Sequence, residues 1–194
     1  MAKNVAQQLV DTLEKAGVRR IYAVTGDSLN FVNDAVRKNG NIQWIHVRHE
    51  EVGAYAAGAE AQLTGHLTCC AGSCGPGHVH LVNGLYDAHR TGAPVLAIAS
   101  AIPMHEMGTE YFQETNPIKL FEDCSYYNQM ASTPQQFPRM LQAAMQYAVS
   151  SKGVAVIGLP GDLASQGSEG AITTTFPCRI REHICPSDHE LKEL

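Results

Sequence analysis

The sequence lacks a hydrophobic run that is long enough to cross a membrane. Its longest apolar stretch, PVLAIASAI at 94–102, is about half of the roughly 20 residues that a membrane helix needs. The N-terminus, MAKNVAQQLVDTLEKAG, has an amphipathic helical pattern with neither a continuous apolar segment nor a small-residue cleavage site, which argues against a secretory signal. We therefore expect a soluble, cytoplasmic protein with no transmembrane segment.

An excess of basic charge is also missing. The formal net charge is −5 at pH 7 with the nine histidines neutral, and the 14 lysines and arginines are scattered along the chain. Nucleic acids and anionic membrane surfaces are bound by clustered basic residues. The charge pattern therefore predicts no nucleic-acid partner and leaves small molecules and proteins.

Several motifs for metals and phosphates are absent too. There is no HExxH or GxxxxGK[ST], and CGPGHVHLVNG does not fit GxGxxG. The segment CCAGSC lacks CxxC spacing and no matching second pair follows, so we predict no metal site. Adjacent Cys69 and Cys70 in an apolar segment indicate reduced, buried thiols more than a disulfide framework.

The sequence does contain a regular alternation of short apolar segments and helical patterns. Its 194 residues are 44% hydrophobic and 17% charged, which suits one compact domain with a sizeable core and a tail. Apolar runs predict strands at 20–24, 42–47, 67–72, 94–100, 125–130 and 154–159. Helical periodicity predicts helices at 5–16, 28–38, 50–64, 77–90 and 134–151.

Several of the expected strands are continuously apolar, which is typical of a parallel sheet covered by helices on both faces. We therefore predict a doubly wound, three-layer α/β/α domain with a six-stranded, mainly parallel sheet. Such sheets bind ligands beyond the carboxyl ends of their strands. The segments that follow the strands are TGDSLN, RHEEV, GSCGPGH, AIPMHEMGTEYFQETN and PGDLA.

The end of the chain changes character after Gly161. SQGSEGAITTTFPCRI has no sustained period, and PSDHELKEL then begins a helix with Ser187 as N-cap and Glu190 three residues on. A helix shorter than about 12 residues is marginal unless it packs on something. We expect residues 1–165 to form the domain and 166–194 to be a linker and the start of a truncated middle domain. The alternative is a short helix docked on the same domain.

Glu50 is the first candidate functional residue. It follows an apolar strand and opens an alanine-rich helix, whose small side chains would let another helix or subunit approach closely. A carboxylate beside such a surface can hold or share a proton with a ligand nitrogen. The alternative is that Glu50 and Glu51 are acids favoured by the helix dipole, without any chemistry. The pattern alone leaves both interpretations open.

Two further segments could line a site. In CGPGH, Pro76 removes one of the amide donors that a phosphate would use, so a tight turn that lets backbone approach a flat ligand fits better. The long aperiodic stretch at 100–116 is of the kind that is often functional, and Phe112 and Gln113 would sit at the ligand end of the sheet. For Phe112 a hydrophobic loop anchor is the equal alternative.

Histidines at four positions could suggest a metal or acid/base site: His49, His78, His80 and His89. Positions 78 and 80 do not face the same way on a helix, so we expect isolated roles.

Six segments, in order and spacing, resemble the N-terminal pyrimidine-binding domain of thiamine diphosphate enzymes. They are VTGDSLN, RHEEVGAYAAGAEAQLTG, GSCGPGHVHLVNGLYDAHR, PVLAIAS, YFQET and VAVIGLPGD. The likeness covers residues 3 to about 165 and is strongest to bacterial pyruvate oxidase and pyruvate:quinone dehydrogenase. Acetolactate synthase is a near relative that shares RHE, GPG and FQET. The resemblance implies the six-stranded thiamine diphosphate-binding fold.

The resemblance also implies roles for individual residues. Glu50 would be catalytic: it would hydrogen-bond N1′ of the cofactor's aminopyrimidine and favour the 4′-imino tautomer, which takes the C2 proton of the thiazolium ring. Thr25, Gly26, Pro76, Gly77 and His80 would line the aminopyrimidine site. Phe112 and Gln113 would face the substrate. Acetolactate synthases usually carry asparagine where His80 stands, which favours the oxidase side.

For the whole enzyme the resemblance implies oxidative decarboxylation of pyruvate, with electrons passed to FAD. Mg²⁺ and FAD would be held by domains absent from this chain, because its GD pairs, GDS at 26–28 and GDL at 161–163, do not form the GDG motif. The active site would be shared with a neighbouring subunit in a homodimer or homotetramer, so the isolated chain would be inactive. The complete enzyme would be cytoplasmic or peripheral at the inner membrane.

Two alternatives remain open from the sequence. One is an acetolactate synthase-like or other 2-keto acid decarboxylase domain. The other is a noncatalytic binding or dimerisation module of the same fold, which would have no need for the Glu50 carboxylate.

Overall fold

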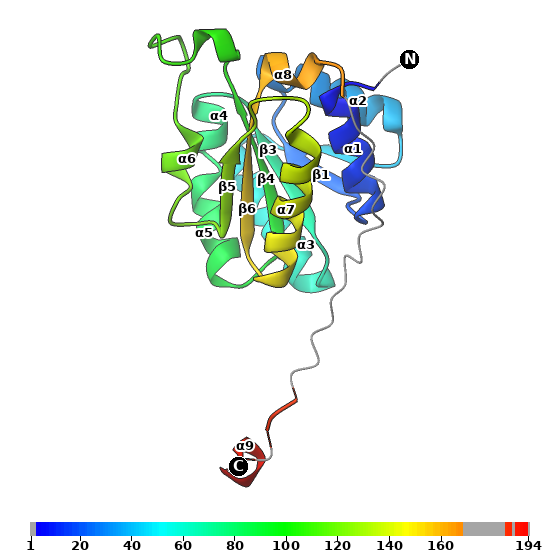
Figure 1. Ribbon diagram of the computed structural model, residues 1–194, viewed down its shortest axis with the longest axis vertical. Helices are drawn as coiled ribbons and strands as arrows, with labels where there is room; N and C mark the ends of the chain where they lie inside the picture. Colours follow the sequence, from blue (N-terminus) through cyan, green and yellow to red (C-terminus); the bar gives the residue numbers. More distant parts are fainter. Residues whose placement is uncertain (1–2, 169–184, 188, 194) are drawn as a thin grey trace.

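A six-stranded parallel sheet forms the middle layer of the domain (Figure 1). The computed structural model describes residues 3–168, 185–187 and 189–193. The strands are β1 (Arg20–Ala23), β2 (Gln43–His46), β3 (Thr68–Gly72), β4 (Val95–Ala101), β5 (Tyr127–Met130) and β6 (Val154–Pro160). Their order is β2-β1-β3-β4-β6-β5, and every neighbouring pair is parallel. The predicted three-layer, doubly wound fold is confirmed.

Helices cover both faces of this sheet. One face carries α1 (Val5–Lys15), α2 (Asn30–Asn39), α7 (Phe137–Ser150) and α8 (Gly161–Ser165), and the other carries α3 (Glu50–Thr64) and α5 (Val82–Arg90). The shorter elements are η1 (Asp27–Leu29), α4 (Pro76–Val79), η2 (Met104–Glu106), α6 (Pro117–Leu120) and α9 (Glu190–Glu193). Among the described residues, no helix combines the length and apolar character needed to cross a membrane.

Alternate side chains of each central strand enter opposite cores. In β3, Cys69 packs with the helices α1, α2 and α7, whereas Cys70 packs with α3 and α5. In β4, Ile98 faces the first core and Ala97 the second, and all seven residues of this strand are buried. Because both faces are covered, these strands read as continuous apolar runs in the sequence instead of alternating ones.

The helix expected over 77–90 is interrupted. The structure has α4 and α5 separated by His80 and Leu81, where the Leu81 N–H donates to the His78 carbonyl three residues back, at 3.1 Å. The expectation of one continuous helix is therefore wrong at this point. Leu81 is fully buried and His80 reaches Glu50, so tertiary contacts act on both residues of the interruption.

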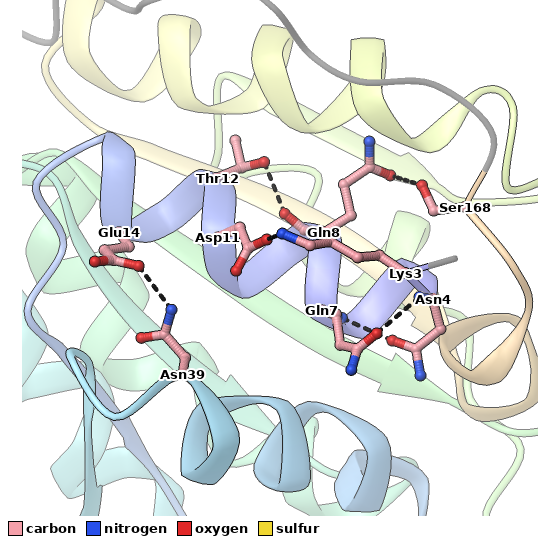
Figure 2. A network of polar contacts seen from close by, with 9 residues as sticks. All are labelled: Lys3, Asn4, Gln7, Gln8, Asp11, Thr12, Glu14, Asn39 and Ser168. Atoms are coloured by element: carbon pink, nitrogen blue, oxygen red, sulfur yellow. Dashed lines mark hydrogen bonds and ion pairs between the residues drawn. The ribbon is translucent and has the colours of Figure 1, made fainter. Parts of the chain in front are cut away.

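Hydrogen bonds tie the segment after α8 to the beginning of α1 (Figure 2). Asn4 and Gln7 form a reciprocal capping box at the N-terminus of α1. The Ser168 hydroxyl donates to the Gln8 side chain, and the Gln166 carbonyl accepts from the backbone N–H of Val5 at 3.0 Å. Residues 166–168 therefore complete the edge of the domain beside α1.

The predicted capping box near the C-terminus is confirmed. Glu190 Oε2 accepts from the backbone N–H of Ser187 at 2.7 Å, and the Ser187 hydroxyl accepts from the Glu190 N–H at 3.3 Å. Most of the expected linker lies outside the described residues. The domain boundary at 165 therefore stays a prediction.

Thiol reactivity tests the burial of the sheet cysteines. Cys69, Cys70 and Cys124 are free and buried. Burial raises the pKa of Cys69 well above its usual value, that of Cys70 to about 12 and that of Cys124 to about 11. Because alkylation needs the thiolate and access to it, these three should stay unmodified by iodoacetamide at about pH 8.

Exposed Cys185 is the internal control for this experiment, since it should be modified at once. Site-resolved mass spectrometry of the native and the urea-unfolded chain measures both rates. Alkylation of Cys69 or Cys70 as fast as that of Cys185 in the native protein would contradict the described core.

Candidate functional site

Segments that follow four different strands meet at the carboxyl edge of the sheet. A methyl group placed on Gly26, after β1, would lie 2.4 Å from Ser73 Oγ, after β3. One placed on Gly77 would lie 3.1 Å from Ser73 Cβ and 3.2 Å from Oε1 of Glu50, which follows β2. One placed on Gly75 would lie 2.7 Å from Cβ of Gln113, in the segment after β4. The fold therefore brings together segments that are up to 87 residues apart in the sequence, from Gly26 to Gln113.

Glu50 is a buried carboxylate at the N-terminus of α3. Its exposed fraction is 8%, and its Oε2 lies 3.0 Å from Nδ1 of His80, which donates because a carboxylate only accepts. Oε1 lies on the side of Gly77. No arginine among the described residues pairs with Glu50, so the carboxylate is not consumed in an ion pair with an arginine of its own fold.

The helix dipole accounts for only part of this arrangement. Glu51, its neighbour, is half-buried and accepts a hydrogen bond from the Asn83 amide at 2.9 Å, as a first-turn acid can. Glu50 instead loses most of its hydration when the chain folds, and this loss is unfavourable in free energy. An acid on the surface keeps its hydration and has no such cost. A dipole-only interpretation explains Glu51 better than Glu50.

His49 and His80 form a stacked pair beside Glu50. Their ring centroids are 4.3 Å apart with an interplanar angle of 26°. His49 is the N-cap of α3, and its Nδ1 accepts from the Glu51 N–H at 3.3 Å, which fixes the ring. His49 thus supports His80, which holds Glu50. The expectation of isolated roles is therefore wrong for His49 and His80; the only sequence signal for a role of His49 at the site is its place directly before Glu50.

The same three side chains lie close enough to be considered as metal ligands. One potential ligand atom from each of His49, Glu50 and His80 lies within 4.8 Å of the others. However, the in-plane lone pairs of stacked imidazoles run side by side instead of converging on one point. His49 Nδ1 is also engaged at the helix N-terminus. Metal binding would therefore require both rings to turn, so we assign the trio to holding the carboxylate.

The turn between β3 and α4 depends on glycine. Gly75 has φ 66° and ψ −124°, a conformation that L-residues with a side chain rarely adopt. A methyl group on Gly72 would lie 2.5 Å from the His78 Cα. The Ser28 hydroxyl accepts from the Cys74 N–H at 2.9 Å and fixes the turn from the β1 side. The absence of a side chain at Gly77 leaves backbone next to the Glu50 carboxylate, and the absence of one at Gly26 lets that residue pack closely on Ser73.

The remaining predicted residues lie around this turn. Thr25 is exposed and directly precedes Gly26, and Pro76 is exposed as the first residue of α4. Gln113 has φ 65°, and its Oε1 accepts from the Cys74 thiol at 3.4 Å. Phe112 is 79% exposed, so it is not the hydrophobic anchor of its loop.

His78 is a second histidine whose contacts the sequence did not predict. It is fully buried, with Nδ1 2.7 Å from the Ser100 carbonyl and Nε2 2.6 Å from the Thr115 hydroxyl. Its ring also makes an edge contact with Phe121. Burial lowers the pKa of His78, and the hydrogen bond to Ser100 opposes this in part.

The lowered pKa of His78 predicts a loss of stability in mild acid. Below its usual pKa of 6.5 the unfolded chain takes up a proton that the folded chain refuses, so the free energy of unfolding should fall as the pH drops below about 6.5. One such group contributes at most about 1.4 kcal/mol per pH unit. Urea unfolding at several pH values from about 8 to about 5.5 measures this slope.

The variant His78→Asn is the comparison for this slope. Burial also lowers the pKa of His89, which contributes in the same direction, so His78→Asn should reduce the slope without abolishing it. Equal slopes in the two proteins would show that His78 is not the buried neutral group described.

Comparison with known proteins agrees with this geometry. The chain is 57% identical over 164 residues to an uncharacterized 42.6 kDa protein in the isoamylase 3′ region of Pseudomonas amyloderamosa. It is 41% identical over 159 residues to pyruvate oxidase of Lactiplantibacillus plantarum and 31% identical over 162 residues to acetolactate synthase 3 of Brassica napus. These alignments cover 84%, 81% and 83% of this chain but 41%, 26% and 25% of the relatives.

The chain thus spans well under half the length of these relatives. Residues 3–120 match the family described as thiamine pyrophosphate enzyme, N-terminal TPP binding domain. This match covers more than half of the chain, and it includes Glu50 and the glycine turn. The chain therefore belongs to the thiamine pyrophosphate enzyme family, as an N-terminal thiamine pyrophosphate-binding domain.

Proposed function

We propose that this chain is the cofactor-activating domain of an enzyme that oxidatively decarboxylates pyruvate, with Glu50 as its catalytic acid/base. The observation that carries the proposal is the state of Glu50: it is 8% exposed, held on one oxygen by His80, and faces a glycine with the other. The identity of 41% to a pyruvate oxidase, against 31% to an acetolactate synthase, supports the substrate and the oxidative outcome.

The contacts of Glu50 are compatible with acid/base catalysis. When bound, thiamine diphosphate supplies the nucleophilic carbon and the electron sink for loss of carbon dioxide. His80 keeps Oε2 in place, so Oε1 is free to share a proton with a ring nitrogen of the aminopyrimidine on the Gly77 side. A positioned acid/base of this kind contributes roughly 10²- to 10⁴-fold in rate.

The neighbouring segments fit the remaining roles. Gly26 and Gly77 let backbone approach a flat ring, and Thr25 and Pro76 lie at the exposed rim. Phe112 and Gln113 lie on the loop after β4, where we expect them to face pyruvate. Mg²⁺ and FAD belong, in this proposal, to segments outside this chain, as do the diphosphate contacts.

An exposed apolar stripe on α3 supports a shared active site. Val52, Tyr55 and Leu63 are 55%, 44% and 88% exposed, and Ala59 between them is exposed as well. Their spacing of three or four residues places them on one face of the helix that begins with Glu50. We propose that this stripe packs on a neighbouring subunit of a homodimer or homotetramer, which covers the site. The free, buried thiols fit a cytoplasmic enzyme.

An acetolactate synthase-like reaction is the second candidate, because such proteins match the same part of the chain. Product analysis separates the two candidates. Both reactions release carbon dioxide; an oxidase then yields a two-carbon product and a reduced electron acceptor, whereas an acetolactate synthase joins the remaining two-carbon unit to a second keto acid without an electron acceptor.

Glu50→Gln is the direct test of the catalytic role. In the longest natural polypeptide that carries this chain, pyruvate turnover should fall by roughly 10²- to 10⁴-fold, because glutamine can accept a hydrogen bond but cannot exchange a proton. Glu51→Gln is the matched control and should keep most of the activity, since the Glu51 side chain contacts Asn83 and the edge of His49 but neither Glu50 nor His80. Unchanged turnover in Glu50→Gln would show that the assigned mechanism is wrong.

Leu63→Lys tests the proposed subunit contact. Leu63 is 88% exposed, so this substitution should leave the folding of the chain unchanged while it places a charge in the proposed contact. Light scattering of the longest natural polypeptide should show dissociation at concentrations where the wild type is assembled. Gln146→Lys, exposed on α7 in the opposite layer, is the control. Equal masses for both variants and the wild type would exclude α3 as the contact.

A further inference from the structure

His78 joins three segments that border the candidate site. It lies in α4, directly after the glycine turn, and it contacts the end of β4 through Ser100 and the loop after β4 through Thr115. The ring is fully buried, and the partners of its two hydrogen bonds and of its edge contact are Ser100, Thr115 and Phe121, none of which is assigned to the cofactor. Its role is therefore separate from that of the His49 and His80 pair.

The two contacts determine which ring nitrogen carries the proton. A carbonyl oxygen can only accept, so Nδ1 must donate to Ser100. Neutral imidazole has one donor and one acceptor, so Nε2 accepts from the Thr115 hydroxyl. Both ends of one rigid ring are thus used, and the ring spans the distance between a central strand and the loop.

The loop from 102 to 116 has few other attachments to the body of the domain. Its first half is held by Asp162, whose carboxylate accepts from the Met104 N–H at 3.1 Å. In the second half, Glu114 accepts from the N–H groups of Gly108 and Tyr111 at 2.6 and 3.2 Å, and these contacts brace the loop only against itself.

The second half of the loop meets the site turn at two adjacent points. Thr115 binds His78, and two residues earlier Gln113 lies against Gly75 and Cys74. Gln113 has φ 65°, a left-handed conformation that is unfavourable for residues other than glycine and that persists only where the surroundings enforce it. The bond between His78 and Thr115 supplies such a constraint.

We propose that His78 is a positioning residue, which fixes the Thr115 end of the loop and thereby places Phe112 and Gln113 at the substrate side of the glycine turn. The proposal rests on the proposed function for its catalytic consequence, but its structural part does not. Loss of the His78–Thr115 bond should release residues 108–116 without disturbing the Glu50 pocket.

Two substitutions break this bond from opposite sides. His78→Asn keeps a donor where Nδ1 stands, so the contact to Ser100 survives while the reach to Thr115 is lost. Thr115→Val removes the hydroxyl and keeps the shape of a side chain that is exposed, so it should fold even if His78→Asn does not. The matched control is Thr109→Val, which removes a hydroxyl bonded only within the same loop, to the Glu106 carbonyl at 2.8 Å.

Hydrogen exchange of the 194-residue chain is the structural measurement. Amide exchange in 108–116 should accelerate roughly three- to tenfold in His78→Asn and in Thr115→Val, as expected for loss of one hydrogen bond. The double variant should show no further acceleration, because both changes remove the same bond. Unchanged exchange in Thr115→Val, or additive effects in the double variant, would overturn the positioning role.

Kinetics of the longest natural polypeptide test the catalytic consequence. kcat/KM for pyruvate should fall by a similar three- to tenfold in both single variants, with the affinity for thiamine diphosphate unchanged and Thr109→Val like the wild type. Faster exchange with unchanged kcat/KM would overturn the proposal. If the wild-type polypeptide did not turn over pyruvate while the exchange results held, the proposed function would fail. The role of His78 in fixing the Thr115 end of the loop would still be supported.

Discussion

The burial of one carboxylate, that of Glu50, is the interaction on which the candidate site depends. A carboxylate that loses its hydration needs compensation from fixed polar groups. Here the compensation comes from the N–H of His80 and from the first turn of α3, whose unpaired backbone amides favour negative charge. His49 completes the arrangement, because it caps that helix and stacks on His80. The result is a charge that is stabilised on one oxygen and available on the other.

Close backbone packing makes this arrangement accessible to a ligand. Gly26 and Gly77 both approach Ser73, and Gly77 also faces Glu50, so a side chain at position 77 would fill the space beside the carboxylate and one at position 26 would clash with Ser73. The parallel sheet explains why these glycines meet, since all carboxyl ends of its strands lie at one edge. The chain reverses its direction of winding between β1 and β3, and the Glu50 site lies at this switch point.

The loop after β4 differs from the closely packed glycine turn, because it is long, largely exposed and attached to the domain at few points. His78 matters there because a buried, neutral ring with two opposed hydrogen bonds resists displacement more than a flexible side chain would. Gln113, with its strained backbone, and Phe112, with its exposed ring, thus lie on a loop that His78 attaches to the body of the domain.

The sequence by itself determined the number and approximate bounds of the six strands and the positions of the longer helices, since these follow from local periodicity, and it singled out Glu50 and the glycine turn by their place after apolar strands. It did not determine the helix break at His80 and Leu81, the stacking of His49 on His80, or the two hydrogen bonds by which His78 joins β4 to the loop. These features depend on contacts between residues that are far apart in the chain, or on side chains whose orientation is set by a packed neighbour. No local sequence pattern predicts such contacts. Only the tertiary structure decided them, because a histidine's role depends on which donors and acceptors the fold brings to its two ring nitrogens.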